Sequence, residues 1–143
     1  MRNTLAQIRS HLLFHAAALS YRGKGIILAA DSGCGKTTLT LALVRQGFKF
    51  LSDDVAALNL NNGELAPYPR SLLIRIGTKR VFQQLGWELP HHDTVLKTDD
   101  RAAIHFPAAL RGDNCQPQIL IIIQRPDESG ERICKVTLDT VMG

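Results

Sequence analysis

Residues 26 to 54 read IILAADSGCGKTTLTLALVRQGFKFLSDD, and this stretch decides the fold class. Residues 26 to 29 are a short continuous apolar run, which predicts a strand buried on both faces. After a glycine-containing loop, residues 36 to 46 place leucine and valine on one helical stripe, and Gly47 is a typical helix stop. Residues 48 to 51 predict the next strand. Strand, loop, helix and strand in this order indicate an α/β fold.

The loop has the pattern of a phosphate-binding loop, Gly-x4-Gly-Lys-Ser/Thr, except that Ala30 replaces the first glycine. Gly33 and Gly35 let the backbone curl so that successive amide groups point at phosphate oxygens. The N-terminus of the following helix adds a partial positive charge. Lys36 is expected to contact the β- and γ-phosphates, and the Thr37 hydroxyl to ligate Mg²⁺. The predicted residues of this nucleoside triphosphate site are Asp31, Ser32, Gly33, Cys34, Gly35, Lys36, Thr37 and Thr38.

Two acidic residues, Asp53 and Asp54, end the strand that follows the helix. The carboxyl ends of adjacent strands in an open α/β sheet share one crevice, so we expect this pair beside the phosphate loop. One carboxylate could bind the metal ion, and the other could accept the proton of an attacking hydroxyl. Asp53 lies only 17 residues after Lys36, which leaves room for one helix and one strand. In motor-type and transporter-type ATPases the metal-binding aspartate usually lies much further along, so the spacing argues against a generic ATP hydrolase.

The chain resembles the HPr kinase/phosphorylase family and its relatives, whose catalytic domain has a phosphoenolpyruvate-carboxykinase-like nucleotide fold. The family pattern runs from a histidine, through a turn, to Gly-Asp-Ser-Gly-x-Gly-Lys-Ser, a helix and an Asp-Asp pair. The matching segments are His15 and residues 23 to 25, 31 to 37, 45 to 47 and 52 to 54, which together span a bit over a quarter of the chain. The resemblance implies a mixed β-sheet core around the strand, phosphate loop and helix.

The resemblance also implies a role for each matched residue, with ATP and Mg²⁺ as cofactors. Lys36 and the loop backbone would hold the ATP phosphates, and Thr37 would bind Mg²⁺. Asp53 and Asp54 would divide the roles of base and metal ligand; the pattern does not assign them individually, and we carry Asp54 forward as the metal candidate. His15 would lie close to the acidic pair, although a lone histidine on an apolar strand is also a common structural residue. The catalytic candidates are therefore Asp53, Asp54, His15 and Lys36.

The sequence departs from HPr kinases after the acidic pair. The glutamate-containing Arg-Gly-Leu-Gly signature is replaced by residues 67 to 77, as in shorter HPr-kinase-related proteins of bacterial gene clusters, so HPr itself is not the expected acceptor. We expect ATP-dependent phosphoryl transfer to a hydroxyl, most simply a serine of a protein or peptide. Two alternatives stay open: a non-catalytic nucleotide-binding regulatory module, and a small-molecule kinase in which the region around Arg70 binds an anionic substrate. Arg75 and Lys79 are weaker candidates for that contact.

Several further short elements are predicted outside the central stretch. Residues 10 to 19 can form a strand, although their alanines leave a helix open, and residues 61 to 63 are a hairpin signal. A short helix is expected to begin at a Thr78 cap and to stop at Gly86. The remaining predicted strands cover residues 72–76, 95–98, 102–106, 119–124 and 133–138. A helix could begin at the last residues, so we expect a single domain, residues 1 to 143, from a longer protein.

Bulk composition limits the partners. The 143 residues fit one domain, and the formal net charge of +4 favours anionic partners such as nucleotides. The basic clusters are short and not interleaved with aromatics, so no nucleic acid is expected. Three cysteines without metal-ligand spacing, together with the lack of a signal peptide, predict a cytoplasmic protein. No apolar run is long enough to cross a membrane. HPr kinases are oligomeric, which admits a homo-oligomer here, although no interface can be identified.

Overall fold

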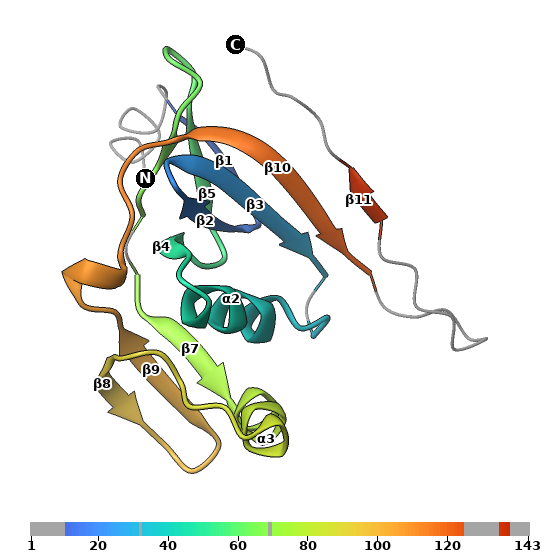
Figure 1. Ribbon diagram of the computed structural model, residues 1–143, viewed down its shortest axis with the longest axis vertical. Coiled ribbons are helices and arrows are strands. Elements are labelled where there is room, and N and C mark those ends of the chain that lie inside the picture. The colour runs from blue at the N-terminus through green and yellow to red at the C-terminus, as the bar shows by residue number, and fades with distance from the viewer. Residues whose placement is uncertain (1–10, 32, 69, 125–134, 138–143) are drawn as a thin grey trace, which may run out of the picture.

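The computed structural model describes residues 11–31, 33–68 and 70–124, together with a strand at 135–137 (Figure 1). Within these residues the chain forms eleven strands, two α-helices and one short 3-10 helix. The strands are β1 (His11–Phe14), β2 (Ala17–Tyr21), β3 (Lys24–Ala30), β4 (Lys49–Ser52), β5 (Ala56–Asn59), β6 (Leu65–Ala66), β7 (Leu72–Arg75), β8 (Asp93–Lys97), β9 (Arg101–His105), β10 (Gln116–Ile123) and β11 (Lys135–Thr137). The helices are α2 (Lys36–Arg45), α3 (Ile76–Leu85) and the 3-10 helix η1 (Ala108–Leu110).

The central sheet has five strands in the order β11-β10-β3-β2-β4. Strand β3 pairs in parallel with β10, whereas β2 is antiparallel to both β3 and β4. The predicted mixed α/β class is therefore confirmed. Strands β3 and β4 run in the same direction, so their carboxyl ends lie at the same end of the sheet. The first residues of the antiparallel strand β2 lie at this end as well.

Strands β3 and β4 are not neighbours, because β2 lies between them. Strand β2 joins β3 through a two-residue hairpin, in which Arg22 and Gly23 both have positive φ angles, of 52° and 78°. Two-residue turns of this hand match the twist of the paired strands. The segment at residues 10 to 19, predicted as one element, is divided at His15 into β1 and β2, which belong to different sheets.

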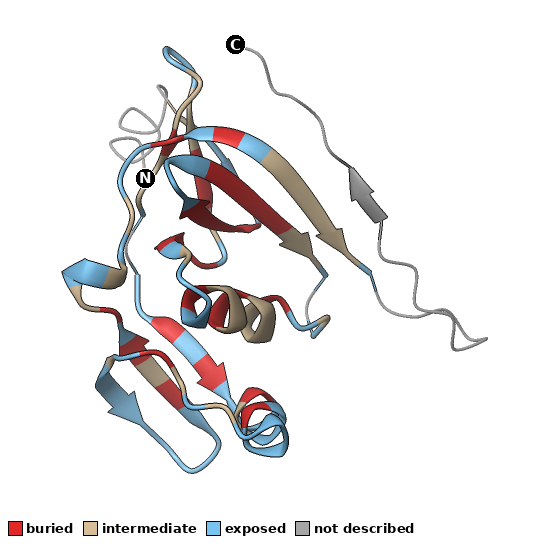
Figure 2. Cartoon of the chain, viewed as in Figure 1, coloured by how far each residue is buried: buried red, intermediate tan, exposed pale blue. Residues whose placement is uncertain are grey.

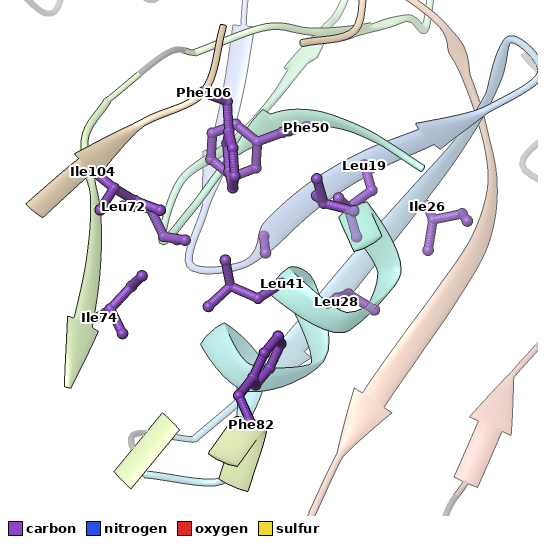
Figure 3. Close-up of a cluster of buried hydrophobic side chains, with 12 residues drawn as sticks. Leu19, Ile26, Leu28, Leu41, Phe50, Leu72, Ile74, Phe82, Ile104 and Phe106 are labelled. Carbon is purple, nitrogen blue, oxygen red and sulfur yellow. The ribbon is translucent and has the colours of Figure 1, made fainter. Parts of the chain in front are cut away.

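Both faces of β3 are covered, as its apolar run predicted. On one face Ile26 and Leu28 pack in a cluster with Leu41 of α2 and Phe50 of β4, which also receives side chains from β7 and α3 (Figure 3). On the other face Ile27 packs with residues of the small β1-β5-β6 sheet and its neighbours. Strands β5 and β6 form the hairpin predicted at residues 61 to 63. The phosphate-loop segment therefore begins from a strand held rigidly between two layers.

A third, antiparallel sheet has the order β7-β9-β8, and α3 follows β7 without an intervening loop (Figure 1). The predicted Thr78 cap is wrong. The N-cap of α3 is Arg75, and Thr78 lies inside the helix, where its hydroxyl is hydrogen-bonded to the Thr38 hydroxyl of α2 at 2.9 Å. The predicted stop is correct, because Gly86 has the left-handed conformation (φ 67°) typical of a helix C-terminus.

The described part of the chain has no helix that is both long and apolar enough to span a membrane. Cys34 and Cys115 are free thiols. Burial and the nearby Glu64 charge raise the pKa of the Cys115 thiol to about 11, so it packs as an uncharged group between sheets. Cys134 lies outside the described residues.

Candidate functional site

The loop between β3 and α2 reaches its turn through two glycines with positive φ angles. Gly33 has φ 81°, and Gly35, the N-cap of α2, has φ 91°. Helix α2 has no side-chain cap at this end, so no side chain occupies its first amide groups, and its first residues line the cavity described below. The amide of Cys34 is hydrogen-bonded to the Asp31 carbonyl at 3.2 Å, which closes the turn internally. This end of α2 can therefore receive an anion.

Lys36 begins α2 and is buried, with 8% of its surface exposed. Its ammonium group donates a hydrogen bond to Asp54 Oδ1 at 2.8 Å. An ammonium group has three donors, so this bond leaves two for other acceptors. Lys36 can thus hold Asp54 and a phosphate oxygen at the same time.

Asp53 is the acid of the site whose pKa is clearly shifted. It is 6% exposed, and its Oδ1 atom has no hydrogen-bond partner among the described residues. Burial raises the pKa of Asp53 to about 6, assisted by the neighbouring Asp54 charge and opposed by Lys36 and by a hydrogen bond from the Asp54 backbone. A buried carboxylate oxygen without a partner is costly and needs an explanation. Binding of a substrate proton or cation would satisfy it.

Asp54 has an unusual backbone conformation, with a φ angle of 65°. The Val55 amide donates a hydrogen bond to the Asp53 carbonyl at 2.8 Å, so Asp54 is the central residue of a tight three-residue turn. The Asp54 carbonyl accepts a hydrogen bond from the Ala16 amide at 3.2 Å. This bond ties the acidic turn to the start of β2, directly after His15. Positive φ at a residue other than glycine is strained and is concentrated at functional sites.

These side chains surround one cavity of about 490 Å³. The cavity is lined by His15, Ala30, Asp31, Gly33, Gly35, Lys36, Thr37, Thr38, Asp53, Asp54, Leu73, Arg75, Gly77, Thr78 and Val81. All described members of the predicted site are therefore together except Cys34, whose amide is already used by Asp31. Ser32 lies outside the described residues.

Apart from Arg75, the wall formed by β7 and α3 was not predicted, because nothing in their sequence pattern shows which of their residues face the loop. Arg75, which had seemed weaker than Arg70 as an anion-binding candidate, lines the cavity. Arg70 does not; its guanidinium carbon lies 5.4 Å from the ring centroid of Tyr68. The hydrogen bond between the Thr78 and Thr38 hydroxyls holds this part of α3 beside the start of α2.

The donor set suits a metal ion that arrives with phosphate groups. Among the described residues no three histidine, cysteine or acidic side chains cluster as a preformed metal site. Magnesium is usually held by one or two carboxylates, a hydroxyl and substrate phosphates rather than by a protein cage. Asp54, whose side chain is 62% exposed, and Thr37 both line the cavity and provide such ligands.

Comparison with known proteins gives one informative result. Neither protein-family models nor curated proteins match this sequence. Among solved structures, the HPr(Ser) kinase/phosphatase from Coxiella burnetii superposes with a TM-score of 0.50 at 19% sequence identity, over 82% of this chain and 62% of that chain. The chain has an HPr kinase-like fold. The resemblance expected from residues 15 to 54 is thus confirmed for the fold, which extends well beyond that segment. The match spans less than two thirds of the Coxiella protein.

Proposed function

We propose that this chain transfers the γ-phosphoryl group of ATP to a hydroxyl group, with a serine of a protein or peptide as the acceptor. The proposal rests mainly on Asp53. A buried carboxylate with a free oxygen and a pKa of about 6 is suited to remove a proton near neutral pH, since a general base works best when its pKa is close to the working pH. The HPr kinase-like fold supports the same chemistry, and the fold alone would not assign it.

The two aspartates differ in a way that supports different roles. Asp53 is buried and lines the cavity, and its Oδ1 has no hydrogen-bond partner among the described residues, so it serves as the base. Asp54 is exposed and paired with Lys36, so it serves with Thr37 as a ligand for Mg²⁺. When bound, Mg²⁺ neutralises charge on the phosphate groups.

The transfer then needs few protein groups. The loop backbone and Lys36 hold the β- and γ-phosphates of ATP. Asp53 accepts the proton of the acceptor hydroxyl while the hydroxyl oxygen forms a bond to the γ-phosphorus. The bond from the γ-phosphorus to the bridging oxygen breaks, and ADP leaves. Lys36 stabilises the charge that develops on that oxygen. His15, an exposed residue that lines the cavity, helps to orient the transferred group.

The decisive test compares two site variants with a matched surface variant. We expect Lys36→Ala to abolish ATP binding measured by calorimetry. Asp53→Asn is expected to retain ATP binding but to lose transfer from γ-labelled ATP to a pool of serine peptides by about 100-fold or more. The control Asp99→Asn alters an exposed acid outside the cavity and should behave like the parent.

The outcomes separate the competing functions. Transfer by Asp53→Asn at the parental rate would exclude Asp53 as the base. Tight ATP binding by the parent without any transfer would instead indicate a nucleotide-binding regulatory module. Labelling of a metabolite pool but not of the peptide pool would indicate a small-molecule kinase.

A further inference from the structure

The β7-β9-β8 sheet is covered on one face only. Leu72, Ile74 and Ile104 are buried and lie on the side of the sheet that faces Leu41 of α2 (Figure 3). The alternate residues point away from the core, and every residue of β8 is exposed (Figure 2). This leaves an open sheet face at the edge of the candidate site.

The strand register shows which side chains share the open face. Directly paired residues point to the same side of a sheet. Leu73 pairs with Ala103, which pairs with Leu96, and Arg75 pairs with Arg101. The open face therefore carries an apolar row across its three strands and, two residues further along β7, a row of two arginines. We call these five residues the outer face.

The arginine row is an electrostatic conflict in the free protein. Like charges directly opposite each other on adjacent strands destabilise a sheet. Arg101 is partly compensated by Asp100, at 3.7 Å in an exposed setting. Arg75 has no ion pair or side-chain hydrogen bond among the described residues. The apolar row is equally incomplete, since Leu96 is 64% exposed. A bound group with both negative and apolar character would relieve both costs.

The outer face is continuous with the candidate site. Leu73 and Arg75 line the cavity as well as the open face. The apolar row extends from Leu73 across β9 to Leu96 of β8, a distance of two strand spacings, or about 10 Å. The nucleotide phosphates are assigned to other residues of the same cavity, at Lys36 and the glycine turn. A molecule seated on the outer face would therefore reach the cavity that contains Asp53 through residues other than those assigned to ATP.

We propose that the outer face binds the acceptor as an extended peptide that carries an acidic side chain two residues from an apolar one. This rests on the proposed kinase function and specifies its substrate class. The two rows are two residues apart along β7, about 7 Å, which is the repeat of same-side residues in an extended chain. The acidic side chain lies between Arg75 and Arg101, and the apolar one lies on Leu73, Ala103 and Leu96.

The test uses synthetic peptides with one serine and the sequence Glu-x-Leu, Gln-x-Leu or Lys-x-Leu, placed at two to six residues on either side of the serine. Binding of fluorescent versions is measured by anisotropy, and phosphorylation is measured with labelled ATP. We expect the parent to prefer Glu-x-Leu over Lys-x-Leu by about tenfold in both assays. Arg75→Glu should reverse this preference without changing the KM for ATP. The control Arg80→Glu reverses an exposed charge on α3 that does not line the cavity and should keep the preference.

The two assays separate this proposal from the kinase function. Preferential binding of Glu-x-Leu without phosphorylation would support the docking surface and refute the kinase. Phosphorylation that ignores the Glu or Lys choice would do the reverse. The docking proposal is also overturned if Arg75→Glu raises the KM for ATP with the peptide preference intact, which would make Arg75 a nucleotide contact. A change in sedimentation of Arg75→Glu with unchanged peptide preference would overturn it as well, because the outer face would then join copies of this chain.

Discussion

Replacement of Asp53 by asparagine should make the unliganded protein more stable while removing its activity. Asp53 is ionised at neutral pH in a buried position, where one of its oxygens has no partner among the described residues. Asparagine has nearly the same shape and carries no charge. The variant therefore removes the cost of a buried charge without creating a cavity.

The size of the effect follows from the pKa of Asp53, which rises from 3.8 to about 6 on folding. The difference between these two pKa values corresponds to about 3 kcal/mol. Because the folded-state pKa is raised, the folded protein binds a proton between pH 3.8 and about 6 that the unfolded chain has already released. The stability contributed by protonated Asp53 is complete below pH 3.8 and is lost as the pH rises through about 6. The advantage of the asparagine variant should thus grow from near zero at low pH to about 3 kcal/mol above pH 6.

The assay is urea unfolding of the parent and variant from pH 3.5 to 8, followed by fluorescence of Trp87, the single tryptophan of the chain. Contributions from groups that do not interact with Asp53 cancel between the two proteins, so the difference in the free energy of unfolding reports Asp53 together with its interactions with Asp54 and Lys36. Asp54→Asn is the matched control. Asp54 is exposed, and its removal deprives buried Lys36 of its partner, so this variant should be destabilised at neutral pH. Parallel pH profiles for the parent and Asp53→Asn would refute the argument that Asp53 is held in a costly ionised state.

Two further predictions concern rate and packing. If Asp53 is the base, kcat/KM should fall about tenfold per pH unit below a midpoint of about pH 6, the pKa of Asp53 in the unliganded protein; a flat profile from pH 5 to 8 would contradict this. Gly25→Ala should lower the free energy of unfolding by about 1–3 kcal/mol, since the new methyl group would lie 2.7 Å from Leu65 Cδ1. Gly77 lies in α3, and a methyl group added there would meet no atom within 4 Å outside its chain neighbours and the backbone of its own helix, so Gly77→Ala should instead raise the melting temperature slightly. Equal effects of the two alanines on stability would exclude the packing argument.

Local sequence signals predicted the part of the site that is local in the chain. The apolar run of β3, the glycine turn and the helix at Lys36 each have a physical signature within a few residues, and the structure contains all three. The acidic pair was also expected at the correct strand end. The wall opposite the loop was not predictable in this way. Thr78 reaches the site through a hydrogen bond to Thr38, 40 residues earlier, and no periodicity records such a contact.

The position of His15 shows why strand direction matters more than strand adjacency for this site. The expectation that the acidic pair would lie beside the loop assumed neighbouring parallel strands, yet β2 separates β3 from β4. The expectation held because β2 is antiparallel to both strands, which keeps β3 and β4 parallel to each other. The same reversal brings the first residues of β2, rather than its last, to the end of the sheet where the candidate site lies. His15 precedes the loop in sequence and still lines its cavity, and the Ala16 to Asp54 backbone bond holds the two segments together. Disruption of β2 pairing should therefore impair the acidic turn as directly as a change in the turn itself.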